Sequence, residues 1–259
     1  MYSSSSTLKS HNVRLFHRMM AIALFAGTLC TSMASAALAQ YNPPADIGLP
    51  SRREPGGTRG SCLGSSGAPV EGLQLTPLMP VDQQSNAYFG QTVSPYPTFY
   101  WHVPVIASPD PEIPNRTPPA AEFVLMDEMG NEIYTTKFQL EPTTQSGLIR
   151  LSLPENAGLA PLEVNKNYKW YFSLICDEFD RGTDIFTEGW VRRVPIDPAL
   201  SLTTANSYAE AGIWFEALDI LAEAQYLGET RPTGEPSITW DSLLEDVGLG
   251  NFANVAFLQ

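Results

Sequence analysis

Apolar and polar residues alternate along the middle of the chain. Between residues 95 and 196 the apolar positions recur every second residue, which is the period of a β-strand with one buried face. In the segment 168–176 one face is formed by Tyr168, Trp170, Phe172, Leu174 and Cys176. About six or seven such segments, separated by turn residues, predict an antiparallel, immunoglobulin-like β-sandwich over residues 95–196.

After residue 197 the apolar spacing changes to three and four residues, which is typical of amphipathic helices. Gly212 interrupts this pattern and predicts a turn between two helices, and Thr239 is a suitable N-cap for a helix over residues 240–247. Three large side chains here need cover from water: Trp214, Phe215 and Trp240. We therefore expect residues 197–259 to form a small helical subdomain packed against the sandwich.

The segment 40–94 has a different composition from the rest of the chain. It is rich in Pro, Gly and Ser, which disfavours regular structure. We expect an extended lead-in that carries Cys62, with a short apolar run at residues 73–78 that could add one edge strand.

Residues 1–39 have the three parts of a secretory signal peptide. The start is basic, residues 19–29 are an apolar centre, and the Ala-Leu-Ala at 37–39 fits a cleavage site. The centre is short for a bilayer span, so an uncleaved membrane anchor is the weaker alternative. We expect cleavage after Ala39 and a periplasmic or secreted protein.

The charge of the chain excludes some classes of partner. Its 28 acidic residues outnumber 15 basic ones and give a net charge of −13. Nucleic acid and anionic lipid are bound through Lys and Arg, so neither is an expected partner. No segment after the signal reaches the roughly 18 consecutive apolar residues of a membrane span.

Two cysteines lie outside the predicted signal, Cys62 and Cys176. An even pair in an oxidising compartment is typical of one disulfide, and a loop of this length would stabilise the fold by about 4–5 kcal/mol. Two separate buried thiols are the alternative. We expect no metal centre and no cofactor, because His102 is the one histidine after the signal and no Cys-x-x-Cys spacing occurs.

Two segments could hold ions. Residues 55–62 combine three glycines with Arg59 and could surround an anion, although a tight turn that brings Cys62 to Cys176 is the plainer interpretation. Farther along, carboxylates could bind calcium weakly, as in extracellular modules. The candidate calcium ligands are Asp177, Asp180 and Asp184. Their spacing is not that of an EF-hand and Arg181 lies among them, which favours a solvated hairpin turn.

Candidate binding and catalytic side chains are few. Tyr100 and Tyr171 are predicted to point away from the core and could form a carbohydrate platform. His102 would have to serve any Ser-His or Cys-His chemistry, but there is no Gly-x-Ser-x-Gly motif, so we expect a structural or surface role. We predict no catalytic residue; hydrolysis by paired carboxylates is a remote alternative.

Several pieces of the sequence, in a specific order and spacing, resemble a known family. They are the segments 55–62, 96–101, 122–134, 147–154, 168–177, 189–193, 212–218 and 240–249. Together they resemble the cyanobacterial domain of unknown function 928 family. The resemblance implies an exported, single-unit protein and supplies no functional residue.

Three functional hypotheses follow. The first is a non-catalytic module of the cell envelope that binds a protein partner, which the sequence does not identify. The second is a carbohydrate- or calcium-binding module that uses Tyr100, Tyr171 and the acidic turn after residue 176. The third is an unrecognised hydrolase.

Overall fold

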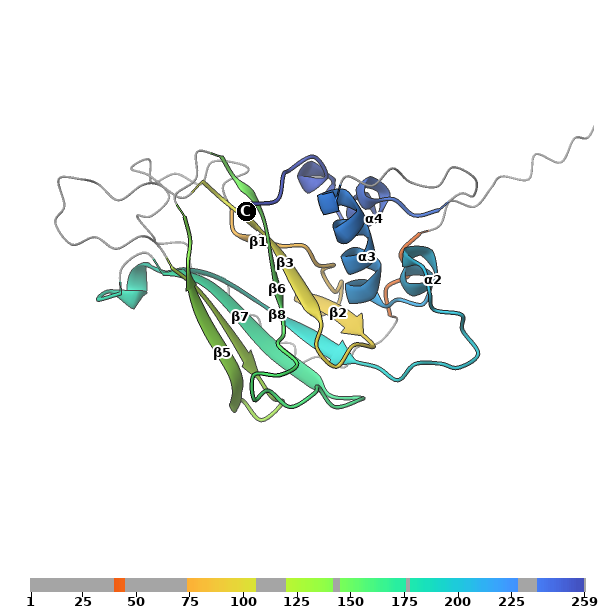
Figure 1. Ribbon diagram of the computed structural model, residues 1–259, viewed down its shortest axis with the longest axis horizontal. Helices are drawn as coiled ribbons and strands as arrows, with labels where there is room; N and C mark the ends of the chain where they lie inside the picture. The colour runs from red at the N-terminus through yellow and green to blue at the C-terminus, as the bar shows by residue number, and fades with distance from the viewer. Residues whose placement is uncertain are drawn as a thin grey trace, which may run out of the picture. The chain divides into compact units, whose positions relative to one another are not determined.

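The computed structural model describes residues 40–44, 74–105, 120–141, 145–175, 178–227 and 237–258. It is mainly β, with two sheets followed by short helices (Figure 1). The strands are β1 (Thr76–Pro77), β2 (Tyr88–Thr92), β3 (Thr98–Val103), β4 (Ala120–Met126), β5 (Glu132–Gln139), β6 (Gly147–Ser152), β7 (Asn167–Ile175) and β8 (Ile185–Arg193). The helices are α2 (Ala205–Glu210), α3 (Trp214–Leu227) and α4 (Trp240–Asp246), with 3₁₀ turns η1 (Arg181–Thr183) and η2 (Gly250–Phe252).

The strands form one mixed and one antiparallel sheet. The five-stranded sheet has the order β2-β8-β7-β4-β5, in which β2 runs parallel to β8 and the other neighbours are antiparallel. The three-stranded sheet has the order β1-β3-β6 and is antiparallel. β1 is the edge strand expected from the apolar run at residues 73–78. Because β1 and β2 both precede residue 95, the sheets begin earlier in the chain than the alternation indicated.

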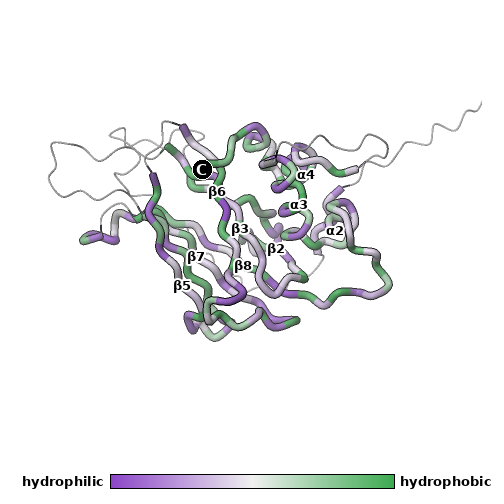
Figure 2. The backbone as a smooth tube through the Cα atoms, in the orientation of Figure 1, coloured by the Kyte–Doolittle hydropathy of each residue, from purple (hydrophilic) through white to green (hydrophobic). Residues whose placement is uncertain are grey.

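The two sheets share an aromatic core. The ring of Trp101 on β3 stacks on Phe172 of β7, with centroids 4.2 Å apart, and Phe99 lies 5.1 Å from Phe123 of β4. Buried and partly exposed residues alternate along β7, as its period of two predicted. Figure 2 shows the same mixture of hydrophobic and hydrophilic positions along the strands. Aromatic side chains of β3 in one sheet are therefore packed against those of β4 and β7 in the other.

The helical region packs on the sheets through α3, which contacts β2 and β3. Phe215 of α3 lies 5.0 Å from Phe99, and the indole N–H of Trp214 donates to the carbonyl of Leu78 over 2.9 Å. Gly90 on β2 leaves room for this helix, since a Cβ there would approach the Phe215 ring to 2.8 Å. The prediction that the helices pack on the sheets is confirmed.

The helix ends also follow the sequence signals. α2 and α3 are separated by Gly212, whose φ is +74°, a conformation that favours glycine. Thr239 caps α4 by accepting from the backbone N–H of Ser242, and Ser242 completes the capping box. Both the turn and the cap agree with the predictions made from local residues.

One buried carboxylate ties α3 to the sheet. In the first turn of α3, Glu216 accepts hydrogen bonds from the hydroxyl of Thr92 (2.6 Å) and from the N–H groups of Val93 (3.0 Å) and Ser94 (2.8 Å). Burial raises the pKa of Glu216, and these bonds oppose the rise by stabilising its charge. The start of α3 is thus held at the end of β2.

Replacing Gly212 with Ala will destabilise the protein more than replacing Gly130 with Ala. Both glycines have positive φ, +74° and +84°, which costs an Ala about 1–2 kcal/mol. A Cβ at position 212 would also lie 2.7 Å from the carbonyl oxygen of Asn42, whereas a Cβ at position 130 meets nothing within 4 Å. Urea denaturation should therefore show that Gly212→Ala lowers the free energy of unfolding by about 3 kcal/mol, which is more than Gly130→Ala does. Equal losses would show that the Asn42 segment does not pack on this turn in solution.

Candidate functional site

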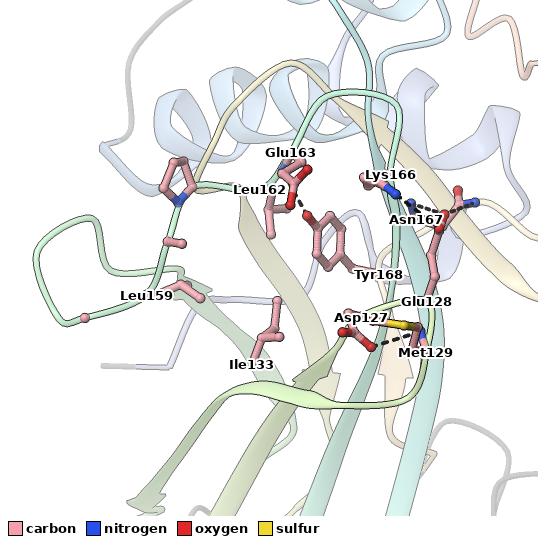
Figure 3. A pocket seen from close by; sticks show the side chains of 13 residues that line it. Asp127, Glu128, Met129, Ile133, Leu159, Leu162, Glu163, Lys166, Asn167 and Tyr168 are labelled. Carbon is pink, nitrogen blue, oxygen red and sulfur yellow. Dashed lines mark hydrogen bonds and ion pairs between the residues drawn. The ribbon is translucent and has the colours of Figure 1, made fainter.

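A groove of about 460 Å³ lies between two connections at one end of the sheets. One wall is the β4–β5 turn at residues 127–131, and the other is the β6–β7 connection at residues 153–166. Apolar side chains from the second wall and from the adjoining strands β5 and β7 point toward one shared space (Figure 3). They are Ile133, Leu159, Leu162 and the ring of Tyr168. The groove is therefore an apolar hollow with a polar rim.

The β4–β5 turn is shaped by Asp127. One carboxylate oxygen of Asp127 accepts from the N–H groups of Met129 (2.9 Å) and Asn131 (2.8 Å), and the other accepts from the side-chain amide of Asn131 (2.8 Å). The hydrogen bonds from Asn131 hold the pKa of Asp127 below its usual value. The charged carboxylate of Asp127 therefore stabilises the turn.

Glu128 joins this turn to the start of β7. Its carboxylate accepts from the backbone N–H of Asn167 (2.9 Å) and from the Asn167 side-chain amide (3.1 Å), and it lies 3.9 Å from the ammonium of Lys166. A register shift between β4 and β5 at Leu125/Met126 leaves Ile133 as an extra residue beside the turn. A bulge of this kind can re-aim a side chain, and here Ile133 lines the groove.

The opposite wall is held by backbone hydrogen bonds. The N–H of Leu162 donates to the carbonyl of Pro95 over 3.0 Å, and the guanidinium of Arg193 donates to the carbonyl of Leu162 over 2.5 Å. The hydroxyl of Tyr168 accepts from the N–H of Glu163 over 2.8 Å. Since that hydroxyl acts as an acceptor, its own hydrogen can be donated to a ligand in the groove.

The rim of the groove is acidic and carries exposed apolar side chains. Asp127, Glu128 and Glu163 line it together with one cation, Lys166. Of the apolar side chains that line it, Met129 is 84% exposed and Ile133 36% exposed. The arrangement can bind an apolar group flanked by positive charge.

The structure corrects the prediction for Tyr100. Tyr100 does point away from the inter-sheet core, but α3 covers that side of β3 and leaves the residue 2% exposed. Its hydroxyl donates to the carboxylate of Asp219 over 2.5 Å. Burial raises the pKa of both groups, with the charge of Asp219 adding to the rise for Tyr100. Tyr100 therefore cannot serve as a surface platform for a sugar ring.

Tyr171 lies on the outer face of the five-stranded sheet. The ammonium of Lys169 is 4.7 Å from the centre of the Tyr171 ring and 6.0 Å from that of Trp190, and it pairs with Glu188 over 3.1 Å. Burial opposes the charge of Lys169, but hydrogen bonds to Tyr171 and Glu188 outweigh it and raise its pKa. Tyr171 keeps its place as a ligand candidate, joined by Trp190, which sequence reasoning missed.

Within the described part of the acidic turn between β7 and β8, Asp180 and Asp184 accept hydrogen bonds from the chain itself. Asp180 accepts from the N–H of Gly182 over 3.1 Å, and Asp184 accepts from Arg181 over 2.5 Å. Arg181 also pairs with Glu122 over 2.6 Å. Within the described residues no group of three or more His, Cys, Asp or Glu side chains is placed to hold a metal ion.

Other predicted residues are structural or lie elsewhere. His102 is 2% exposed, has its Nδ1 3.1 Å from the carbonyl of Gln74, and packs against Phe252. Burial lowers its pKa. The remaining predicted site residues, which are Arg59, Cys62, Cys176 and Asp177, lie outside the described residues.

Sequence reasoning found the β4–β5 turn but did not assign it a role. The groove needs the 153–166 connection as its second wall, and no local pattern predicts that this connection lies beside the turn. The usable signal was Met129, a large apolar residue inside a turn of polar residues.

Comparison with known proteins places the chain in a family. A family model described as Domain of Unknown Function (DUF928) matches residues 54–257. The chain belongs to this family. The groove, the outer face around Tyr171 and the Glu216 anchor all lie within the DUF928 match. Among the residues described for this DUF928 protein, no helix has both the length and the apolar character needed to cross a membrane.

Other comparisons add little. No curated protein matches the sequence. A solved structure, "Crystal structure of putative beta-galactosidase from bacteroides fragilis", matches with a TM-score of 0.25 and 14% sequence identity. The match covers 47% of this chain and 16% of that chain, so this chain spans only a small part of that protein. A likeness this distant carries no argument about activity.

Replacing Asp219 with Asn will change how stability depends on pH. Because burial raises the pKa of Asp219 above 3.8, the unfolded chain loses its proton first, and wild-type stability falls as pH rises through the folded-state pKa. The side-chain amide of the Asp219→Asn variant can still accept from Tyr100 but does not titrate. Urea unfolding across pH 3–8 should show the variant gaining stability relative to wild type as pH rises above about 4. A constant difference across that range would contradict the burial of this carboxyl.

Proposed function

We propose that this DUF928 protein is a non-catalytic interaction module of the cell envelope that binds a protein partner at the groove. The observation that carries the proposal is the groove of 460 Å³ with exposed apolar side chains on its rim. Met129 is exposed at the groove, and Ile133 reaches both the groove and solvent. Exposed apolar side chains that gather around a hollow are typical of recognition sites.

The polar residues of the groove suit recognition more than bond cleavage. Asp127 and Glu128 use their carboxylates to build the turn and to fasten it to Asn167. Tyr168 offers a hydroxyl that can donate to a bound backbone carbonyl. A rigid frame of this kind orients a ligand at a small entropic cost on binding.

The envelope location rests on the sequence. The basic, apolar and small-residue parts of residues 1–39 support export to the periplasm or the medium. In that compartment Cys62 and Cys176 would form the predicted disulfide. We further propose an immunoglobulin-like sandwich, supported by the stacking of Trp101 on Phe172 between the sheets. The parallel strand β2 is a departure from an all-antiparallel arrangement.

Polar substitutions on the groove rim will remove partner binding without unfolding the protein. The test variant is Met129→Ser/Ile133→Ser, and the matched control is Ile196→Ser/Ile220→Ser, which also removes two exposed apolar side chains. The full chain is immobilised, and the envelope proteins that it captures are measured by quantitative mass spectrometry. The groove variant should capture at least tenfold less of the partner than wild type does. The control should stay within twofold of wild type. Equal recovery by groove variant and wild type, with both folded by circular dichroism, would contradict the proposal.

A carbohydrate-binding function is the second candidate, and one observation favours it. Tyr171 and Trp190 share the outer face of the five-stranded sheet, with the Lys169–Glu188 ion pair between them. Aromatic rings beside hydrogen-bonding charged groups can hold a sugar ring by stacking and polar contact.

If sugar binding occurs on this face, it depends on Trp190 more than on Phe186. Both aromatic residues lie on the outer face of β8 and are partly exposed, but the Lys169 contact involves only Trp190. In calorimetric titrations with soluble glycans, Trp190→Ala should abolish the heat seen with wild type, and Phe186→Ala should keep it. The absence of heat for wild type with every glycan tested would remove this candidate.

A further inference from the structure

Strand β5 presents a long open edge. β5 ends the five-stranded sheet and pairs with β4 on one side, and within the described residues no strand pairs with its other side. In an antiparallel pair every second residue of an edge strand directs its N–H and C=O outward. Over the eight residues Glu132–Gln139, these groups form a template for an added strand.

The other sheet edges are short or covered. Val81 bridges Tyr88, and the N–H of Phe89 donates to the carbonyl of Pro80, so chain from before β2 covers that edge. The edge of β6 is bridged by Phe257. β1 is two residues long. Among the described strands, β5 therefore has the longest edge without a partner strand.

The open edge begins at the groove. Ile133, the second residue of β5, lines the groove, and the register shift at Leu125/Met126 sets it apart from the regular ladder. A strand added along β5 would therefore pass the mouth of the groove. One of its side chains could enter between Ile133 and Tyr168 while its backbone pairs with β5.

The charges around this edge select the partner. Asp127, Glu128 and Glu163 line the groove, and Glu132 is exposed at the start of β5. The nearby cations are already engaged, because Lys137 pairs with Glu178 and Lys166 lies beside Glu128. The site thus carries an excess of negative charge, as does the whole chain at −13. A second copy of this acidic chain would be repelled, whereas a basic segment would be attracted.

We infer that an extended, basic polypeptide segment of a partner protein adds as a strand to β5 and places one apolar side chain in the groove. The inference rests on the proposed function and specifies its partner. The groove binds the apolar side chain, and the β5 backbone sets the orientation of the added strand. The acidic rim favours a basic segment over an acidic one.

The test uses the full chain and labelled synthetic peptides in a fluorescence anisotropy titration. The probe is an eight-residue peptide in which Lys alternates with Val or Leu. One comparison peptide has Glu in place of each Lys, and another is N-methylated on alternate backbone nitrogens, which keeps the charge but blocks strand pairing. We expect the probe to bind, the N-methylated peptide to bind at least tenfold more weakly, and the Glu peptide to show no binding. An equal affinity for the N-methylated peptide would overturn strand addition, and an equal affinity for the Glu peptide would overturn charge selection.

Matched charge variants of the protein locate the binding. Glu132→Gln/Glu163→Gln should weaken binding of the Lys peptide at least threefold and reduce its dependence on salt. Glu210→Gln/Glu245→Gln removes the same charge from the helical region and should leave binding unchanged. Equal weakening by both pairs would overturn the assignment to β5. If the peptides fail while Met129→Ser/Ile133→Ser still abolishes partner capture, this inference fails and the proposed function stands.

Discussion

The fold depends on the burial of aromatic rings between the two sheets. Trp101 contacts Phe99, Phe123, Trp170 and Phe172, and it is completely buried. Its indole N–H has no hydrogen-bond partner within the described structure, which costs about 1–3 kcal/mol. Burial of an aromatic side chain is worth at least as much, and each ring pair adds about 0.5–1.5 kcal/mol. The aromatic contacts therefore outweigh the lost hydrogen bond and hold the sheets together.

The α3 helix, which contacts both β2 and β3, extends this core. Phe215 continues the aromatic cluster through Phe99, and Tyr100 is sealed beneath the same helix. A helix in this place needs a fixed start, which Glu216 provides by accepting three hydrogen bonds at the end of β2. Removing a carboxylate from water without such hydrogen-bond partners would cost a large amount of free energy. Burial of Glu216 therefore depends on these hydrogen bonds.

Sequence reasoning succeeded where the deciding interactions are local. Alternation within β7 and the Thr239 cap of α4 each depend on residues close in the chain, and both were predicted. The parallel pairing of β2 with β8 depends on residues about a hundred positions apart, and β2 itself contains Gly90, which weakens a strand signal. For Tyr100, alternation correctly gave the side of β3, but it carries no information about which element covers that side.

The candidate site was missed for the same physical reason. Asp127-Glu128-Met129-Gly130-Asn131 predicts a turn, but a groove requires the second wall that Leu159 and Leu162 supply. That wall is set by Arg193 and by Pro95, each far from it in sequence.

The two ends of the molecule use their acidic residues differently. At the helical end Glu216 and Asp219 are drawn inward, and Asp246 accepts from the backbone N–H of Tyr41. At the loop end Glu163 at the groove rim and Glu132 at the start of β5 remain exposed. Carboxylates that are paired inside the fold interact little with molecules outside it. Carboxylates beside an apolar groove and an open strand edge can interact with an approaching partner. The helices and the aromatic core therefore act as the scaffold, and recognition falls to the loop end, where the scaffold holds Ile133 and Tyr168 in place.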